Sequence, residues 1–365
     1  MVDDSILELS RLFPTLPVYI KSNPEFEHYR VSYNRALTDH FLTIPNASPL
    51  AIRSGGHDFF GRSVVTDGIV INMLAMDSIT ISPGRTSARV DGGVIAGALQ
   101  QFLSAHQLFT PTAQLKTVGY MSWAFGGGYR FYIGTYGFGV DQILGARVVV
   151  ASGEIIDTDD DQELLWALRR AGAGNFGVIV ELRVKVCPAP KLYAGYLAFP
   201  LSEAATVFEG LGPVLANTVE ETTAAAYGVG DLSSATFFCR TNIRGLNPEV
   251  GAIFSHHPPV HPLSAVIIYN NHGKGIRTKT PNGFSACFPN RFPRAILGEL
   301  EERGLALDGG FPSVFPPKQI DVKQFFGMQA TENLRRLKSR LSCWEVARRY
   351  FRAIGHDSGS LWSFL

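Results

Sequence analysis

Hydrophobic and polar positions between residues 68 and 186 alternate in short runs, interrupted by two stretches of helical spacing. Apolar runs bounded by Gly, Pro, Ser or Asp predict strands over residues 68–72, 78–82, 88–92, 146–152, 154–158 and 178–186. Residues 94–108 and 161–171 carry apolar side chains at helical spacing and predict amphipathic helices. Three short strands followed by a helix are typical of an α+β layer, not of a repeated βαβ array.

The pattern changes after Pro188 and Pro190, which mark a boundary. Beyond it, apolar runs predict strands over 193–199 and 264–270, and residues 202–215 predict a helix. At the C-terminal end, a helix is predicted with an apolar face and a basic face. The apolar face holds Leu334, Leu337, Leu341 and Trp344, and the basic face holds Arg335, Arg336, Lys338 and Arg340.

Composition narrows the classes of partner. The chain has 365 residues, 45% of them hydrophobic, and a formal net charge of +1, which describes a globular protein with room for two domains. Because the charge is near neutral, we interpret the C-terminal helix as a docking helix with a solvated basic face and expect no nucleic-acid partner. No apolar run is long enough for a membrane span. Asp3 and Asp4 stand where a secretory signal carries positive charge, so we expect a cytoplasmic location.

Metal binding is not expected. The four cysteines, Cys187, Cys239, Cys287 and Cys343, are far apart and form no CxxC pair, so we interpret them as reduced thiols. His256, His257 and His261 lie in a proline-rich segment, which we expect to be a stiff surface loop with no carboxylate or cysteine beside it.

The segment AIRSGGHDFFGR, residues 51–62, is the first candidate for chemistry. A short strand ends near Ile52, and Gly55-Gly56 then turns the chain and presents His57. Adjacent glycines allow main-chain N–H groups to approach a ligand closely, which suits a pyrophosphate. The alternative is a plain glycine turn with a histidine that caps a neighbouring group.

A second glycine cluster lies between residues 126 and 139, interleaved with aromatic residues. Its glycines are Gly126, Gly127, Gly128, Gly134, Gly137 and Gly139. Because glycine in the interior of a helix or strand costs about 0.5–1 kcal/mol, we expect neither element there and a close approach of backbone instead. We expect most of its aromatic rings to pack the loop from beneath, and one or two to border a planar ligand.

A third glycine pattern matches a dinucleotide-binding motif only in its spacing. Gly172, Gly174 and Gly177 satisfy G-x-G-x-x-G, but a helix precedes them and a strand follows, the reverse of the dinucleotide-binding order. We therefore interpret residues 172–177 as a helix C-terminal turn that leads into the next strand.

Taken in order, these motifs resemble the flavin-binding domain of FAD-linked oxidases of the vanillyl-alcohol oxidase superfamily, with its PCMH-type FAD-binding fold. The branch most similar is that of berberine-bridge-like enzymes and 6-hydroxynicotine oxidase. The resemblance runs from about residue 49 to residue 190. It rests on four motifs: RSGGHD (residues 53–58), TVG (117–119), the glycine cluster and GAGNFGVI (172–179). It implies an α+β fold, with a smaller α/β substrate domain built on an antiparallel sheet.

The resemblance also implies which residues bind FAD. The RSGGH turn would cradle the pyrophosphate, with His57 attached covalently to the flavin, and Leu115 replaces the cysteine that forms a second attachment in some relatives. A bicovalent flavin is thereby excluded. The cofactor-binding residues so implied are Arg53, Ser54, Gly55, Gly56, His57, Asp58, Val118, Gly119, Gly126, Gly127, Gly128, Tyr136, Gly137, Asn175, Gly177 and Val178.

A weaker likeness covers the second region. Residues 264–292 resemble the substrate-domain strand and turn, which makes Tyr269, Asn270 and His272 pocket candidates and Tyr269 and His272 the candidates for catalysis. Two family features have no match: the helix of a βαβ unit before residue 51, and the Y-x-N segment that carries a catalytic base in some relatives. The chain is either a streamlined member of the family or the product of an imperfect gene model.

The implied organisation has four parts: an N-terminal segment over 1–48, the FAD-binding domain over 49–190, a substrate domain over 191–310, and a returning helix over 311–365. The implied function is oxidation of a small molecule by FAD with O2 as acceptor, in secondary metabolism. A non-redox flavoprotein and a degraded, non-catalytic homologue remain as alternatives.

Overall fold

The structure is a computed structural model. It describes residues 50–191 except 59–60, 66–68, 130–131 and 173, and shorter stretches on either side. These stretches are 11–12, 14–15, 17–20, 22–30, 199–217, 224–227, 238–243, 246–257, 266–270, 284–289, 293–307, 323 and 326–341.

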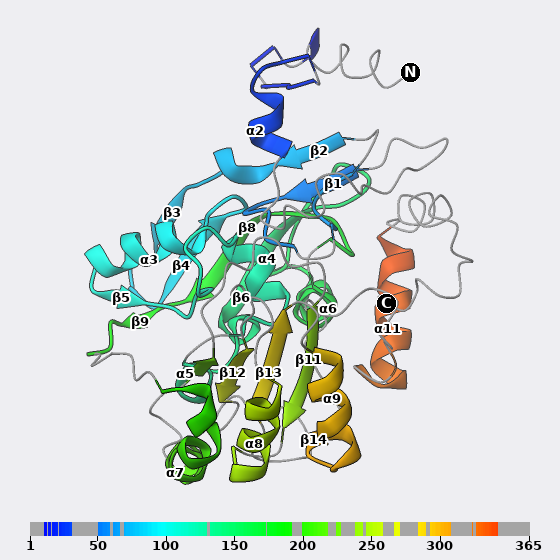
Figure 1. The fold of residues 1–365 in the computed structure, drawn as a ribbon. Coiled ribbons are helices and arrows are strands. Elements are labelled where there is room, and N and C mark those ends of the chain that lie inside the picture. Colours follow the sequence, from blue (N-terminus) through cyan, green and yellow to red (C-terminus); the bar gives the residue numbers. More distant parts are fainter. Residues whose placement is uncertain are drawn as a thin grey trace.

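The first of two five-stranded sheets has the strand order β3-β4-β8-β6-β7, and every pairing in it is antiparallel. Its strands are β3 (Ile79–Ile81), β4 (Ser87–Asp91), β6 (Ile143–Val149), β7 (Ile155–Asp157) and β8 (Val178–Lys185). Each of the five corresponds to a strand that the alternation of the sequence predicts, with shifts of a few residues at the ends. Figure 1 shows the strands of this sheet in cyan and green.

Helices cover one face of the first sheet. They are α3 (Ala96–Ala105), α4 (Tyr120–Phe125) and α6 (Gln162–Ala171). Leu99 of α3, Tyr120 of α4 and Leu164 of α6 are fully buried in one core with Val90, Val148 and Leu182 of the sheet. The alternation of the strands explains this packing, because every second residue points into the core.

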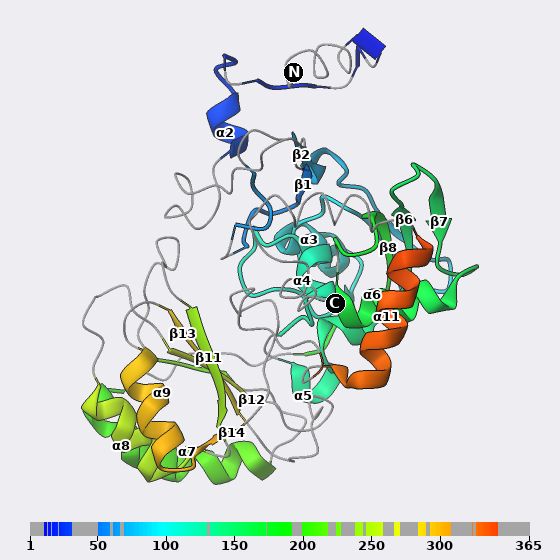
Figure 2. The same cartoon turned by 90° about the vertical axis from the view of Figure 1, so that its right-hand side faces the viewer.

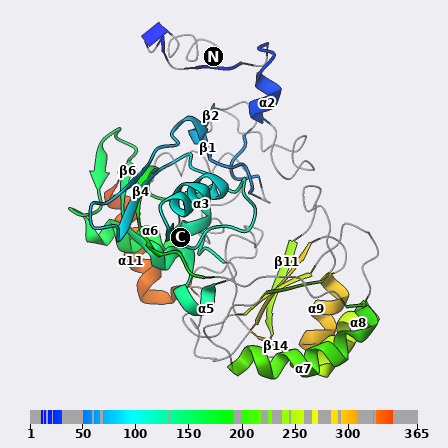
Figure 3. The same cartoon turned by 90° about the vertical axis from the view of Figure 1, so that its left-hand side faces the viewer.

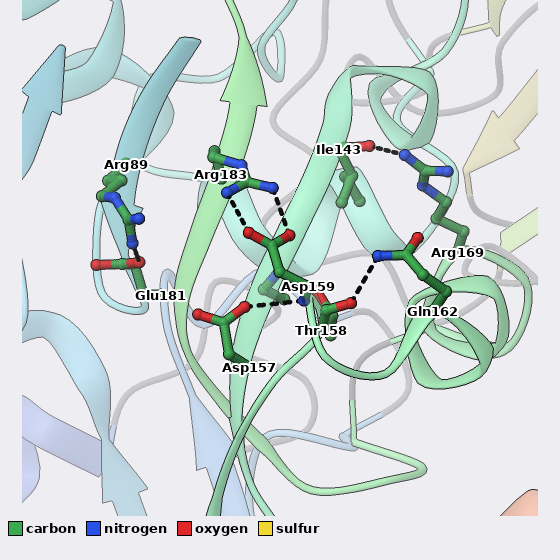
Figure 4. A network of polar contacts seen from close by, with 10 residues as sticks. Arg89, Ile143, Asp157, Thr158, Asp159, Gln162, Arg169, Glu181 and Arg183 are labelled. Carbon is green, nitrogen blue, oxygen red and sulfur yellow. Dashed lines mark hydrogen bonds and ion pairs between the residues drawn. The ribbon is translucent and has the colours of Figure 1, made fainter. Parts of the chain in front are cut away.

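The first sheet also carries paired charges. Arg183 of β8 makes a bidentate ion pair with Asp159, at 2.5 and 2.6 Å, and Arg89 of β4 pairs with Glu181 (Figure 4). Asp159 follows β7, so the bidentate pair ties the end of β7 to the central strand. Next to it, Gln162 of α6 donates to the carbonyl of Thr158 at 2.9 Å, and the guanidinium of Arg169 donates to the carbonyl of Ile143.

A two-stranded parallel sheet precedes the first large sheet. It pairs β1 (Leu50–Arg53) with β2 (Ile69–Asn72), which is followed by the short helix η2 (Met73–Ala75). The strand predicted over 68–72 is thereby confirmed. Helix α2 (Phe26–Arg30) lies on the N-terminal side of this pair (Figure 1).

A second five-stranded sheet has the order β10-β12-β13-β11-β14, again antiparallel throughout. Its strands are β10 (Ala224–Tyr227), β11 (Phe238–Ile243), β12 (Val266–Asn270), β13 (Phe284–Pro289) and β14 (Ala306–Leu307). The expectation of an antiparallel sheet in the second region is confirmed. The strand predicted over 193–199 falls almost entirely on residues outside the described part of the chain.

Three helices pack on one side of the second sheet: α7 (Ala204–Asn217), α8 (Pro248–His256) and α9 (Pro293–Glu302). Phe208, Phe254 and Leu300, one from each helix, form a separate core, and Ala306 of β14 packs against it. Figures 2 and 3 both show the second sheet between these helices and the elements of the first sheet. The buried residues of the first core lie between 88 and 186 and at Leu334 and Leu337, and those of the second lie between 208 and 300. The domain boundaries stay a prediction.

The C-terminal helix α11 (Met328–Arg340) packs against α6, as Figure 2 shows. Leu334 and Leu337 are buried in the first core, so the docking interpretation is confirmed. The basic face differs from the prediction. Lys338 is only 4% exposed, while Arg336 and Arg340 form ion pairs with Glu163 and Asp161 at the start of α6 rather than facing solvent alone.

Candidate functional site

The RSGGH turn follows β1 directly and lies against the loop that precedes α4. A Cβ built on Gly55 would lie 2.3 Å from the main-chain nitrogen of Gly119 and 2.3 Å from the carbonyl oxygen of Thr117. A Cβ on Gly119 would in turn lie 2.3 Å from Ser54 Oγ. Only glycine fits at these two positions, so the RSGGH and TVG motifs are parts of one structure. Gly56 follows with a φ of +68°, a left-handed conformation that favours glycine.

His57 leaves this turn as a partly buried side chain. Its Nε2 lies 2.8 Å from Oγ1 of Thr117, across 60 positions of sequence. Burial, with a further contribution from the positive charge of Arg53, lowers the pKa of His57 to about 4. The imidazole is therefore neutral at neutral pH, as a nucleophilic nitrogen requires.

Arg53 anchors the turn at its start. Its side chain is buried, with only 8% of the residue exposed, and its guanidinium donates to the main-chain carbonyl of Tyr29 in α2. Desolvation by burial lowers the pKa of Arg53. Asp58 follows His57 and accepts a hydrogen bond from the main-chain nitrogen of Arg62 at 2.6 Å. Arg53 and Asp58 thus hold the two ends of the turn by contacts to neighbouring segments.

The loop before α4 is fixed by two main-chain hydrogen bonds to the residues at the start of α3. The main-chain nitrogen of Ala96 donates to the carbonyl of Val118 at 2.8 Å, and that of Tyr120 donates to the carbonyl of Val94 at 2.9 Å. Leu115 lies at the start of this loop and is 41% exposed. These hydrogen bonds from the start of α3 therefore hold Val118 and Gly119 in place against the RSGGH turn.

The glycine cluster folds back on itself. The main-chain nitrogen of Gly139 donates to the carbonyl of Gly128 at 2.9 Å, and a Cβ on Gly128 would lie 2.3 Å from the Cα of Gly139. This is the close approach of backbone that the glycine content predicts. The expectation that the cluster holds no helix is wrong, because α5 (Ile133–Tyr136) and the 3-10 helix η3 (Gly139–Gln142) each form one short turn.

Helix α4 is an element that the sequence pattern does not predict. It ends where Gly126 begins the cluster, and the cluster continues with Gly127 at a φ of +108° and Gly128 at +74°. Its six residues are too few to show a helical period in the sequence.

The aromatic residues of the cluster pack largely on one another and on the loop. Tyr129 and Phe138 meet at 4.8 Å between ring centroids, and Trp123 donates to the carbonyl of Tyr129 at 3.0 Å. Tyr136 packs against Phe109 at 5.1 Å, and burial raises its pKa, with a further rise from the neighbouring Cys187. Gly137 has a φ of +82° and lies against the carboxylate of Asp141.

Gly172 and residues 174–178 form the helix end and strand start that the reversed order of elements predicts. Gly172 caps α6 with a φ of +78°, and its main-chain nitrogen donates to the carbonyl of Leu168 at 3.0 Å. Asn175 donates its side-chain amide to the carbonyl of Ala171. Gly177 packs onto the carbonyl of Val149, where a Cβ would lie 2.4 Å away, and Val178 pairs with the same residue. These residues lie beyond α6, apart from the RSGGH turn in sequence.

The substrate-pocket candidates are described only in part. Tyr269 and Asn270 end the second sheet's strand β12, where Tyr269 is paired with Ala224 and Ser285. His272 lies outside the described residues. Their assignment to a pocket and to catalysis stays a prediction.

The histidine-rich segment differs from its prediction. His256 is the last residue of α8, and His257 Nε2 lies 2.8 Å from a carboxylate oxygen of Glu299 in α9. A carboxylate therefore does lie beside His257, while His261 lies outside the described residues. Among the described residues no group of three or more His, Cys, Asp or Glu could hold a metal ion. None of the described helices is long and apolar enough to cross a bilayer.

The site residue that sequence reasoning does not single out is Thr117. The family motif names its position only as the first residue of TVG, and nothing in the local sequence indicates a contact to His57. The residues present fit a bound dinucleotide, because the main chains of two glycine motifs meet closely and Ser54 Oγ is buried beside them without a hydrogen bond within the described part of the chain.

Comparison with known proteins agrees with this fit. The family described as an FAD binding domain matches residues 45–159. The FAD-linked oxidoreductase aurO of Gibberella zeae is 36% identical over 237 residues, which are 60% of this chain and 46% of that protein. The (R)-6-hydroxynicotine oxidase of Paenarthrobacter nicotinovorans is 38% identical over 157 residues, 42% of this chain and 34% of that protein. The matched sequence thus spans less than half the length of these relatives.

Solved structures show the same fold over nearly the whole chain. The 6-hydroxy-D-nicotine oxidase of Arthrobacter nicotinovorans superimposes with a TM-score of 0.72 at 20% identity, covering 93% of this chain and 97% of that one. A variant of berberine bridge enzyme gives a TM-score of 0.74 at 14% identity, covering 94% and 98%. The α+β fold expected from the sequence is confirmed. The chain therefore carries an FAD-binding domain, and its relatives in sequence and fold are the 6-hydroxynicotine oxidase and berberine-bridge-enzyme-like FAD-linked oxidoreductases.

Proposed function

We propose that this protein is an FAD-dependent oxidase of a small molecule and that it holds FAD covalently through His57. The observation that carries the proposal is the neutral, partly buried imidazole of His57 at the exit of a glycine turn inside an FAD-binding domain. When bound, FAD supplies a hydride acceptor and passes the electrons on to O2. The protein itself binds FAD, orients it and shields it from solvent.

Different residues of the site contribute to FAD binding in different ways. Gly55 and Gly119 let the main chains of the RSGGH and TVG motifs meet closely, and the buried Ser54 Oγ beside them offers a polar atom to a pyrophosphate. Arg53 helps to keep His57 neutral through its charge. Leu115 offers no second nucleophile, so a single attachment is consistent with the sequence.

A small nitrogen-containing aromatic molecule is the substrate class that we favour. Two relatives are named for oxidation of 6-hydroxynicotine and of tetrahydroberberine, and this supports the proposal by analogy alone. Tyr269 and His272 remain our proposed catalytic residues. Tyr269→Phe and His272→Ala variants that both retain full turnover on a true substrate would remove that assignment.

The test of the proposed oxidase activity is anaerobic. The purified yellow protein is mixed with a panel of aromatic amines and phenols, and its visible absorbance is followed. An oxidase loses its absorbance with substrate, regains it in air and releases one H2O2 per turnover. Product formation without bleaching or peroxide would indicate a non-redox flavoprotein instead, and no response to any compound would favour a non-catalytic homologue.

A further inference from the structure

Thr117 is placed beside His57 by the backbone, not by packing of its own side chain. Residues 115–118 form a turn, closed by a 3.1 Å hydrogen bond from the nitrogen of Val118 to the carbonyl of Leu115. The carbonyl of Thr117 lies against Gly55, in the space that a Cβ there would need. The Thr117 residue is otherwise exposed. Its hydroxyl is therefore held at 2.8 Å from His57 Nε2 by two main-chain segments that meet at glycines.

A neutral imidazole carries one proton and one lone pair on its two nitrogens, and a partner at one nitrogen selects between the two tautomers. Thr117 Oγ1 can accept a hydrogen bond from Nε2–H, which leaves the lone pair on Nδ1. Alternatively, it can donate to Nε2, which occupies the lone pair there. Because the pKa of His57 is lowered to about 4, the ring is neutral in either case, and the hydroxyl decides which nitrogen reacts.

We propose that Thr117 is a positioning residue for flavin attachment: its Oγ1 accepts the Nε2–H of His57, fixes the plane of the ring and directs Nδ1 toward the flavin. This inference rests on the proposed covalent linkage. In the attachment, a bond forms between Nδ1 and the 8α-methyl carbon, one methyl C–H bond breaks, and the imidazole gives up its Nε2 proton. The two electrons and two protons released reduce O2 to H2O2.

The loss of the Nε2 proton explains why a hydrogen-bond acceptor at Nε2 favours attachment. Positive charge develops on the ring as Nδ1 forms its bond, and Nε2 must lose its proton before the product is neutral. A hydroxyl oxygen at 2.8 Å stabilises that charge and lies where the proton leaves. Valine at position 117 has nearly the same shape but cannot accept, whereas serine keeps the oxygen.

The experiment measures attachment directly. Wild type, Thr117→Val, Thr117→Ser and the control Thr80→Val are produced in riboflavin-limited cells and purified. Each is incubated with FAD in air, and samples are denatured at intervals. Flavin that remains with the chain is read as in-gel fluorescence and as the mass of the intact protein. Thr80 is exposed on β3, where it pairs with Arg89 of β4, and controls for replacing an exposed threonine by valine.

We expect Thr117→Val to attach FAD about tenfold more slowly than wild type, and Thr117→Ser and Thr80→Val to stay within about twofold. Thermal unfolding of all four flavin-free proteins should coincide, because residue 117 is exposed. NMR of the isolated flavin peptide should find Nδ1 substituted in wild type. Thr117→Val attaching at the wild-type rate, or substitution at Nε2, would overturn the inference.

The two proposals fail separately. Wild-type protein that binds FAD but never retains it after denaturation would remove the covalent linkage itself, and the role of Thr117 with it. Wild-type protein that retains FAD while Thr117→Val does so equally fast would leave the linkage in place and remove only Thr117.

Discussion

Gly55 and Gly119 occupy the space that each other's side chain would need. A Cβ on Gly119 would lie 2.7 Å from the main-chain nitrogen of Gly55, and a Cβ on Gly55 would lie 2.3 Å from that of Gly119. Gly119 has a φ of −61°, which any residue adopts. Its requirement for glycine is therefore steric and arises from the contact between the two motifs.

Gly119→Ala should consequently destabilise the protein by about 1–3 kcal/mol, as overpacking does, and weaken FAD binding by spreading the cradle. The free energy of unfolding from urea titration measures the first effect, and flavin content after gel filtration measures the second. Gly298→Ala in α9 is the matched control, since a Cβ there meets nothing within 4 Å. Equal stability of Gly119→Ala and wild type would contradict the close approach.

The lowered pKa of His57 predicts a dependence of stability on pH. Above about pH 6.5, the imidazole is neutral in the folded and the unfolded chain, so pH has no effect through this residue. Between there and about pH 4, only the unfolded chain takes up the proton, so stability falls as pH falls. Below about pH 4 both forms are protonated and the loss levels off.

This slope is measured as the urea midpoint of flavin-free protein between pH 8 and pH 4, against His57→Asn. The variant should lack the part of the slope that His57 contributes. Parallel curves for the two proteins would show that the folded pKa of His57 is not lowered.

Arg53→Gln should narrow that pH interval. Removing the positive charge raises the pKa of His57 toward its usual value, because the charge of Arg53 opposes protonation of the ring. The variant also loses the hydrogen bond to Tyr29, which lowers stability at every pH. Comparison with the Arg53→Gln/His57→Asn double variant separates the two effects, and an unchanged interval would assign the whole pKa shift to burial.

The C-terminal helix should be held by its apolar face more than by its ion pairs. Leu334 is fully buried, so Leu334→Ala should lower the free energy of unfolding by about 2–5 kcal/mol. Arg336 pairs with Glu163, but its side chain is 70% exposed, and Arg336→Ala should cost less than about 1 kcal/mol. Chemical denaturation of both variants tests the order, and the reverse order would mean that the charges dock the helix.

The elements that the sequence predicts well are those with strong local signals. Strand β4 alternates apolar and polar residues, and α6 is capped by Asp161, whose side chain accepts from the nitrogen of Leu164 at 2.9 Å. Helix α4 escapes prediction because six residues between two glycines show no period. Lys338 is predicted on the solvated face and is buried, because helical spacing indicates a face but not what packs against it.

In the candidate site too, the sequence predicts the local motifs but not the contacts between distant segments. The RSGGH and TVG motifs are recognisable one at a time, and the resemblance to a family joins them. The contact between His57 and Thr117 is not predictable, since it depends on how two loops 60 residues apart meet. The carboxylate of Glu299 beside His257 escapes prediction for the same reason. The boundaries of the domains, the pocket residues and the cytoplasmic location stay predictions.

The most direct test of the central claim is the fate of the flavin when the chain is denatured. Wild-type protein and His57→Ala are purified with FAD present and precipitated with acid. We expect yellow colour and flavin fluorescence to stay with the wild-type pellet, and to pass entirely into the supernatant for His57→Ala. Flavin released from the wild-type protein, or retained equally by the variant, would contradict the assignment of His57 as the covalent anchor.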